Sequence, residues 1–362
     1  MKLINKISKA FAVVTVALLS FSCESDSNNV IEKYPTIVEI LDADAANFSI
    51  LKAALVKTDL LNTFRNPGSY TVFAPKNSAF IAAGITEATI AATTTTADIA
   101  TLRRILQYHV LSIGTIASDF PSKGYISSFS PLVTGFTAAS TPPQQALTST
   151  SVFISMYVNK TNGVVLNGGN TNGGATVLQA DINASNGIIH VISNVLSIPK
   201  VHNLIIANPD LSSLVGVLTS APQAAVLTDV TSATGPIPSS SASSLSRLIF
   251  APTNAAFSSA SFLTGQSDAN ITKVLRYHIA NNNTRASSST VFVAPASAPN
   301  PPVTTPLVIN TQLTGPQQTI SIAAGTVKIA DITAANATIR TINIQGSNGV
   351  AHIIDKVLQP TL

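Results

Sequence analysis

The sequence predicts an α+β fold made of two similar units in tandem. The first observation is a repeated phrase: TVFAPKNSAF at 71–80 returns as LIFAPTNAAF at 248–257. The second is that three further blocks recur in the same order around these phrases. The third is that helical periodicity comes first in each unit and strand-like segments follow, which is typical of an α+β domain.

Four recurring blocks in one order indicate an internal duplication. Equivalent blocks are separated by 163, 177, 169 and 162 residues in chain order, so insertions of different length lie between them. We place the boundary near SIPK (197–200), which gives a first domain over 34–199 and a second over 200–362. Besides the phrase, the pairs are NFSILKAAL (47–55) with DLSSLVGVL (210–218), ATLRRILQYHVL (100–111) with NITKVLRYHIA (270–280), and SNGIIHVISNVL (185–196) with SNGVAHIIDKVL (347–358).

The repeated phrase predicts a strand that runs directly into a helix. TVFA and LIFA are β-rich runs, and Pro75 and Pro252 end them. Asn77 and Asn254 are the expected N-caps of the helices that follow.

The Tyr-His blocks predict amphipathic helices, because apolar side chains and the histidine recur at i, i+3, i+4 and i+7. These positions are Leu102, Ile105, Leu106 and His109 in the first unit, and Ile271, Val274, Leu275 and His278 in the second.

Strand-like segments complete each unit. SVFISMYV (151–158) and VLQADI (177–182) are expected strands, and the Asn-Gly pairs at 186–187 and 348–349 predict hairpin turns into a final strand. NGGNTNGG (167–174) is expected to be a flexible turn. The two units also differ at TSATGPIPSSSASSLS (231–246), an expected mobile loop, and at APNPPVTTP (298–306), an expected extended segment.

The N-terminus predicts a bacterial lipoprotein signal over residues 1–22. Three lysines precede an apolar run (10–22) that is too short to span a membrane, and Cys23, the only cysteine, follows at once. LSFSC is similar to a lipobox, although Ser20 stands where Leu is preferred. The alternative is an ordinary signal peptide near a free thiol, for which a secreted chain has little use. We expect a lipid anchor on Cys23, a polar tether over 23–33 and a place in the cell envelope, in the outer membrane with a periplasmic or surface orientation.

The charge balance excludes a nucleic-acid binder. The chain has 20 Lys+Arg and 16 Asp+Glu, and loss of the three signal-peptide lysines leaves 17 against 16. A nearly neutral mature protein lacks the basic surface that nucleic acids require. GxSxG, phosphate-loop and HExxH motifs are absent from the sequence, so we expect no enzyme and no cofactor.

These blocks in this order resemble the fasciclin (FAS1) domain, over essentially all of 34–362. That family has a TVFAPTN-type block, a helix that ends in Tyr-His and an NGVIHVID-type final strand. The resemblance implies two compact α+β domains, each a small β-sandwich or wedge with flanking helices. It also implies a role in cell adhesion or matrix interaction, with a cell-surface or matrix protein or a polysaccharide as partner.

The four repeat-related histidines raise the hypothesis of a metal or acid–base site. His109 and His190 would have to meet in the first domain, and His278 and His352 in the second. The alternative is a neutral histidine bonded inside the fold, since the first of each pair lies on an apolar helix face and the second among Ile and Val. No Asp, Glu or Cys recurs beside them at ligand spacing, so we expect no metal.

The resemblance also implies candidate binding residues. Segments implicated in integrin recognition in matrix members match Tyr108–His109 and Tyr277–His278, and match an Asp-Ile pair before the Asn-Gly turn, Asp181–Ile182. The second domain has Asn343 instead of the acid. The alternative for the Tyr-His pairs is a purely structural role on the apolar helix face.

A second function class is glycan capture at the cell surface. Sugar platforms usually need exposed aromatic faces, and the chain has no Trp and only six Tyr. Tyr125 and Tyr157 are the candidates, and the alternative for Tyr157 is a place in the core. The function that we expect is therefore non-catalytic adhesion or matrix interaction, with glycan capture as the first alternative and an enzyme of unknown reaction as the second.

Overall fold

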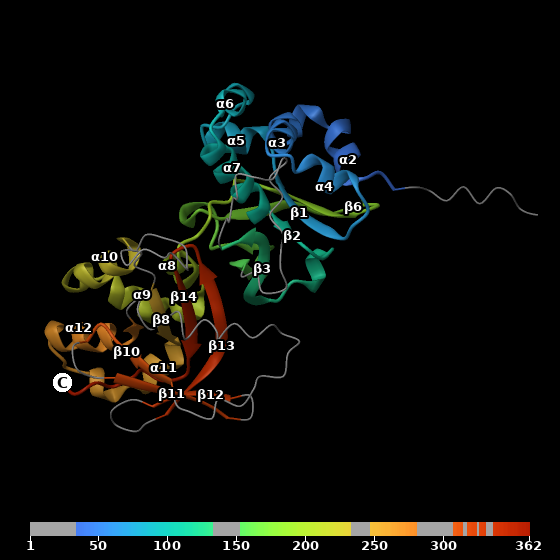
Figure 1. The fold of residues 1–362 in the computed structure, drawn as a ribbon. Coiled ribbons are helices and arrows are strands. Elements are labelled where there is room, and N and C mark those ends of the chain that lie inside the picture. The colour runs from blue at the N-terminus through green and yellow to red at the C-terminus, as the bar shows by residue number, and fades with distance from the viewer. Residues whose placement is uncertain are drawn as a thin grey trace, which may run out of the picture. The chain divides into compact units, whose positions relative to one another are not determined.

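Two consecutive sets of helices and strands make up the fold (Figure 1). The computed structural model describes residues 34–132, 153–232, 247–280, 307–313, 317–323, 326–330 and 336–362. The expected signal peptide, Cys23 and tether lie outside these residues, as do 233–246 and 298–306. The first set is α2 (Ile37–Ala43), α3 (Ala45–Lys57), α4 (Leu61–Arg65), β1 (Tyr70–Pro75), α5 (Asn77–Ala82), α6 (Glu87–Ala92), α7 (Thr96–Tyr108), β2 (Val110–Leu111), the 3₁₀ turn η1 (Ala117–Asp119), β3 (Lys123–Pro131), β4 (Phe153–Asn159), β5 (Val165–Leu166), η2 (Asn170–Asn172), β6 (Ala175–Ala184) and β7 (Gly187–Ile192).

The second set repeats this order from α8, which takes the place of α2. It comprises α8 (Val201–Ile206), η3 (Pro209–Leu211), α9 (Ser212–Leu218), η4 (Ala221–Gln223), α10 (Ala224–Ser232), β8 (Arg247–Pro252), α11 (Asn254–Ser259), η5 (Ser261–Leu263), α12 (Asp268–Tyr277), β9 (Ile279–Ala280), β10 (Leu307–Asn310), β11 (Gln317–Ala323), β12 (Thr326–Ala330), β13 (Ala337–Gly346) and β14 (Gly349–Ile354). The expected α+β class is confirmed, and so are the predicted Tyr-His helices and the strands of the repeated phrases.

The strands of each set form one seven-stranded sheet. Their orders are β2-β1-β7-β6-β5-β4-β3 and β10-β11-β12-β13-β14-β8-β9. The pairs β1–β7 and β8–β14 are parallel, and the other described pairs are antiparallel. The repeated phrase therefore lies beside the Asn-Gly strand, which is far away in the sequence.

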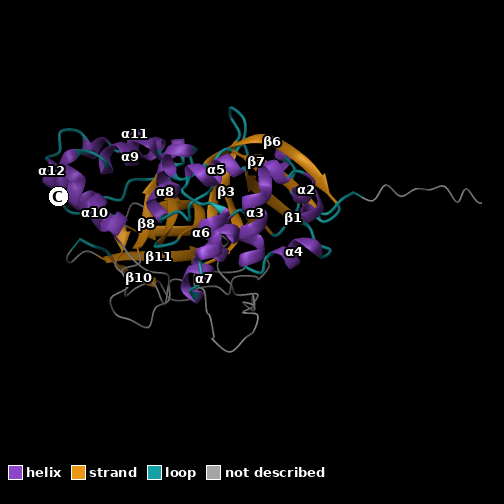
Figure 2. Ribbon diagram, turned by 90° about the horizontal axis from the view of Figure 1, so that it is seen from above, coloured by secondary structure: helices purple, strands orange, loops and turns teal. Residues whose placement is uncertain are grey.

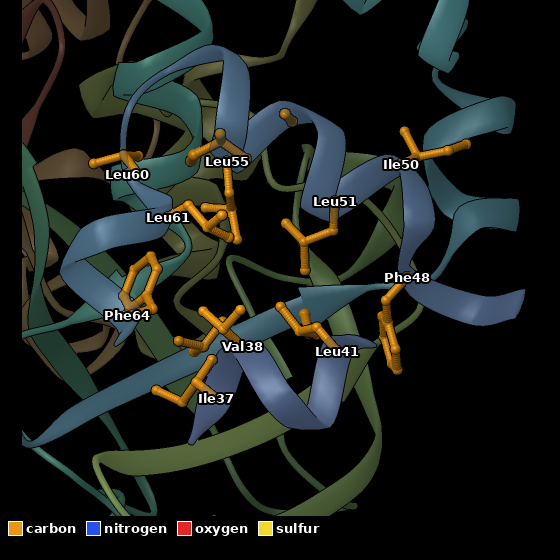
Figure 3. Close-up of a cluster of buried hydrophobic side chains, with 14 of the residues drawn as sticks. Ile37, Val38, Leu41, Phe48, Ile50, Leu51, Leu55, Leu60, Leu61 and Phe64 are labelled. Carbon is orange, nitrogen blue, oxygen red and sulfur yellow. The ribbon is translucent and has the colours of Figure 1, made fainter. Parts of the chain in front are cut away.

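The strand β1 is buried on both faces, which explains its continuous apolar run. Val72 and Ala74 face a core that the helices cover, whereas Phe73 faces a second core inside the curled sheet. Figure 3 shows the first core, in which side chains of α2, α3 and α4 point toward one another. The helices and strands of the fold are distinguished by colour in Figure 2.

The predicted hairpin is present, but its turn is shifted by one residue. Ala184 pairs with Gly187, so the two turn residues are Ser185 and Asn186, and the glycine begins the strand. A Cβ on Gly187 would lie 2.2 Å from the Tyr70 carbonyl oxygen of the neighbouring parallel strand. The glycine is thus required by close strand approach and not by the turn.

Asn186 connects this turn to both ends of the helical layer. Its Oδ1 accepts from the Ile37 N–H at 2.9 Å, at the start of α2. Its Nδ2 donates to the Phe64 carbonyl at 2.7 Å, at the end of α4. Asn348 repeats the arrangement with Val201 and Val230 in the second set. These bonds satisfy terminal helix groups that have no partner within their own helices.

The predicted N-caps at Asn77 and Asn254 are wrong by one residue. Lys76 and Thr253 hold the cap positions, and the Thr253 hydroxyl accepts from the Ala256 N–H. The Asn77 side chain instead inserts into the backbone ladder of α3: Oδ1 accepts from the Ile50 N–H at 3.0 Å, and Nδ2 donates to the Ala46 carbonyl at 3.0 Å. An i→i−4 bond joins these two groups in a regular helix.

The second set shows the same insertion. Asn254 accepts from the Ser213 N–H at 2.8 Å and donates to the Pro209 carbonyl at 2.9 Å. At this position the helix is divided into η3 and α9. The shared asparagine therefore fastens the strand–helix corner to the first long helix, because its amide has the donor and acceptor of a peptide group.

The segment 167–174 is not the flexible turn that its composition predicts. Asn167 is fully buried; its Oδ1 accepts from the Tyr157 N–H at 2.9 Å, and its Nδ2 donates to the Tyr108 hydroxyl at 2.8 Å. Asn172 donates to the Asn203 carbonyl of α8 at 2.8 Å. Side-chain amides fix this turn, which composition alone does not reveal.

Asn77→Asp is expected to lower the free energy of unfolding by about 1–3 kcal/mol. The carboxylate keeps the acceptor for Ile50, but it loses the donor to Ala46 and brings a negative charge to that carbonyl. Urea unfolding measures the change.

Ser78→Asp is the matched control, since it adds the same charge at an exposed position of the same helical turn. A carboxylate in the first turn of a helix is expected to leave the free energy of unfolding unchanged or to raise it slightly. Equal stability of the two variants would contradict the role assigned to the Asn77 amide.

Candidate functional site

The Tyr-His pair of the first domain lies in the core. Tyr108 is fully buried, and its hydroxyl donates to the Ser155 carbonyl at 2.9 Å. His109 has 2% exposure; its Nδ1 lies 2.8 Å from the Ile105 carbonyl, and its Nε2 accepts from the Leu196 N–H at 2.8 Å. The ring is therefore neutral with its proton on Nδ1, and burial lowers the pKa of His109 to about 4.

The second domain repeats this arrangement. His278 Nδ1 lies 2.8 Å from the Val274 carbonyl, and Nε2 accepts from the Leu358 N–H at 2.9 Å. Tyr277 is fully buried. The structure thus gives the candidates Tyr108, His109, Tyr277 and His278 no side-chain surface for a partner, because the helix directs them inward and backbone groups bind both imidazole nitrogens. This burial is what the alternative for the Tyr-His pairs, a purely structural role on the apolar helix face, predicts.

Asp181 lies at an exposed bulge of β6. The register with β7 shifts between Gln179 and Ile182, and Asp181 has a φ of 61°. Asp and Asn adopt this left-handed backbone more readily than other residues with a Cβ. The equivalent Asn343 has a φ of 57°. The left-handed backbone thus explains why Asp or Asn occupies this position. Only the residue of the first domain is an acid.

His190 holds the bulge from inside. The Asp181 N–H donates to His190 Nδ1 at 3.2 Å, so Nε2 carries the proton, at 2.9 Å from the Thr115 carbonyl. Burial lowers the pKa of His190, and the Thr115 bond and the Asp181 charge oppose this shift. In the second domain the Asn343 N–H donates to His352 Nδ1 at 3.1 Å. The strand histidines therefore support the bulges.

The Asp181 carboxylate is partly free at the surface. Oδ1 accepts from the Ala117 N–H at 2.7 Å, and 44% of the side chain is exposed. Among the described residues, none binds Oδ2 by a hydrogen bond. Ile182 is half-buried and packs against the core of the helical layer. This pair is therefore a charged group on a fixed backbone with an apolar neighbour that anchors the strand.

The aromatic candidates for glycan capture are already engaged in packing and hydrogen bonds within the protein. Tyr157 is 1% exposed, and its hydroxyl donates to Asn208 Oδ1 at 3.2 Å. The Tyr125 hydroxyl donates to the Leu204 carbonyl at 3.0 Å, and the two rings are 4.9 Å apart between centroids. Both side chains pack against the start of the second domain. Their faces are thus not available as a sugar platform.

The paired histidines do not gather into a metal site in the described part of the chain. No group of three His, Cys, Asp or Glu side chains lies close enough there to hold an ion. His109 and His190 bind different backbone groups, and all four of their ring nitrogens are engaged.

No single helix among the described residues is long and apolar enough to cross a membrane. In the same part of the chain one bent pair, Pro209–Leu218 and Ala221–Ser232 at 79°, passes that test together.

Comparisons with known proteins agree with this arrangement. A model of the fasciclin domain matches residues 46–199 and 216–360. Uncharacterized protein sll1735 of Synechocystis sp. is 34% identical over 162 residues, which are 45% of this chain and 97% of that protein. Protein sll1483 of the same organism is 33% identical over 164 residues, 45% of this chain and 74% of that protein.

A solved structure is also similar, the FAS1 domain pair from the insect cell adhesion molecule Fasciclin I. The similarity covers 86% of this chain and 96% of that chain, with 14% identity and a TM-score of 0.47.

The buried His109 predicts acid destabilisation of the first domain. In the unfolded chain His109 has a pKa near 6.5 and is protonated below that pH. In the folded protein the same ring stays neutral down to about pH 4. The stability contributed by neutral His109 is therefore complete above pH 6.5 and is lost as the pH falls toward 4, by an amount on the order of 3 kcal/mol.

Urea unfolding at several pH values measures this loss. His109→Gln is expected to be less stable at pH 7 and to lose less stability between pH 6.5 and 4 than the unmodified protein. Equal pH slopes for the two proteins would contradict the assignment.

Proposed function

This chain belongs to the fasciclin family, with two fasciclin domains in tandem, and we propose that it is an envelope-anchored, non-catalytic adhesion lipoprotein that binds a matrix or cell-surface partner. The observation that supports a specific contact is the exposed Asp181 carboxylate on the bulge of β6. Adhesion is the general role of fasciclin domains.

Three properties of the Asp181 site suit it to recognition. The bulge is fixed by bonds to His190 and Ala117, so little ordering cost arises on binding. The carboxylate accepts charge-assisted hydrogen bonds from a cationic or N–H-rich partner. Exposed apolar side chains lie nearby in the chain, with Leu178 at 59% and Ile116 at 38% exposure. An acid beside apolar surface is a common composition of protein interfaces.

The two domains contribute unequally under this proposal. Asn343 retains the backbone of the bulge without the charge. A partner that requires the carboxylate would then bind the first domain, and the second domain would extend the surface or bind something else. Two domains on one anchored chain gain avidity when both engage the same surface.

Asp181→Asn is expected to weaken partner binding about tenfold or more, because charge-assisted bonds are lost. The fold should persist, since Asn occupies the same backbone in the second domain. An array of matrix proteins and polysaccharides identifies the partner, and surface plasmon resonance then measures its affinity for both proteins.

Asp119→Asn is the matched control, because it removes an exposed carboxylate from the adjacent turn η1. Unchanged binding by Asp181→Asn, or an equal loss with Asp119→Asn, would refute the assignment. The absence of any bound protein or polysaccharide would count against adhesion itself.

Cys23→Ala is expected to move the protein from the membrane fraction to the soluble fraction, because the acyl chains have no other attachment point in the sequence. Fractionation with immunoblotting measures this. A Cys23→Ser variant should behave in the same way. Persistent membrane association of both variants would contradict lipid anchoring.

A further inference from the structure

The second domain contains an apolar pocket with a volume of about 330 Å³. It lies between α9, α11 and α12, which group together in Figures 1 and 2. The wall is formed mainly by aliphatic and aromatic side chains, including Leu214, Val217, Phe257, Leu263 and Val274. No charged residue lines it, and the polar members are Thr264 and His278.

A difference between the two domains explains the pocket. The shared tyrosine lies 28 positions after the shared phenylalanine in the first domain (Phe80 and Tyr108) and 20 positions after it in the second (Phe257 and Tyr277). The longer connection contains the helix α6, whereas the shorter one contains only the 3₁₀ turn η5. The second domain therefore lacks a helix at this place.

In the first domain that helix fills the equivalent space. Ile90 of α6 is 4% exposed, and it belongs to the same core as Leu51 of α3, Phe80 of α5 and Leu106 of α7. Phe80 is consequently only 1% exposed. The counterparts of these walls in the second domain, Leu214, Phe257 and Leu275, line the pocket instead.

The shared phenylalanine is more exposed in the second domain than in the first. Phe257 is half-buried although its sequence context matches that of Phe80. Leu263 is also half-buried and Thr264 is exposed, so the pocket reaches the surface beside η5. Solvent has access to apolar walls there, which favours a ligand that removes them from water.

We propose that the second domain binds a small uncharged apolar molecule, or the apolar part of a larger one, in this pocket. A dry cavity of about 150 Å³ lined by Leu, Ile and Phe is enough to bind one benzene ring. The pocket has about twice that volume, which suits two fused rings or a short aliphatic chain, and it lies within the range of small-molecule sites.

The wall chemistry makes the ligand class specific. Both nitrogens of His278 are bonded to backbone groups, so the imidazole offers only its carbon edge. The Thr264 hydroxyl at the rim is available to orient one polar atom of the ligand. A charged group inside the pocket would lose its hydration without an ionic partner, which is costly.

Binding is tested with N-phenyl-1-naphthylamine, an uncharged fluorescent molecule. It is added to the purified Cys23→Ala chain, which carries no acyl group that competes. We expect saturable binding of one molecule per chain and displacement by naphthalene or decan-1-ol. The displacing compound shows whether the pocket takes aromatic or aliphatic ligands. Failure to saturate, or displacement by neither compound, would overturn the proposal.

Ala260→Phe places a large apolar side chain in the pocket, as Ile90 fills the equivalent core of the first domain. We expect at least a tenfold loss of binding with no decrease in Tm. Ala83→Phe is the matched control, because Ala83 is the exposed equivalent in the first domain, and it should bind normally. Val217→Phe from the opposite wall replaces Ala260→Phe if that variant is less stable. Normal binding by the filled variants would place the probe elsewhere and refute the site.

Discussion

The parallel pairing of the phrase strand with the Asn-Gly strand is the constraint on which each domain depends. It joins the first and last parts of a domain, and it requires Gly187 against Tyr70 and Gly349 against Arg247 because a Cβ would strike the neighbouring carbonyl. The asparagine before each glycine then bonds to the start and the end of the helical layer. The Asn-Gly dipeptide therefore permits the parallel strand pairing and also attaches the helices to the sheet.

Buried neutral polar groups hold much of this protein together. The carboxamide of Asn186 and the imidazoles of His109 and His190 each bridge backbone groups of separate elements. The Asn77 carboxamide joins α5 to the backbone of α3, and that of Asn167 joins the Tyr157 N–H to the Tyr108 hydroxyl. A neutral group with all its bonds made costs far less to bury than an ion. This accounts physically for a fold that is stable with only 10% charged residues. It also makes the histidines sensitive to acid, since protonation removes an acceptor from each ring.

The two domains share the residues that connect their helices and strands, and they differ in features at the surface. The Asn corner, the Tyr-His pair and the bulge histidine are the same in both domains. The charge at the bulge and the helix over the shared phenylalanine are not. Asp181 is a charged surface group in the first domain only, and the pocket of the second domain exists where α6 is missing. The two domains therefore share a scaffold and present different chemistry to their surroundings.

The sequence by itself determined the duplication, the α+β class, the Tyr-His helices and the strands on either side of the Asn-Gly turn, because these depend on local periodicity and on recurring blocks. It pointed to the His, Asn and Asp positions, but it could not assign their roles. Asn77 and Asn186 act on backbone groups 27 and 149 residues away, which no local pattern encodes. Tyr125 and Tyr157 were candidates for ligand binding, with a place in the core as the alternative for Tyr157, and only the tertiary structure shows that they bond to Leu204 of α8 and to Asn208 beyond it. The pocket likewise lies where the connection of the second domain is shorter, and only the tertiary structure shows that Leu214, Phe257 and Leu275, the counterparts of side chains that share a core with Ile90, line it.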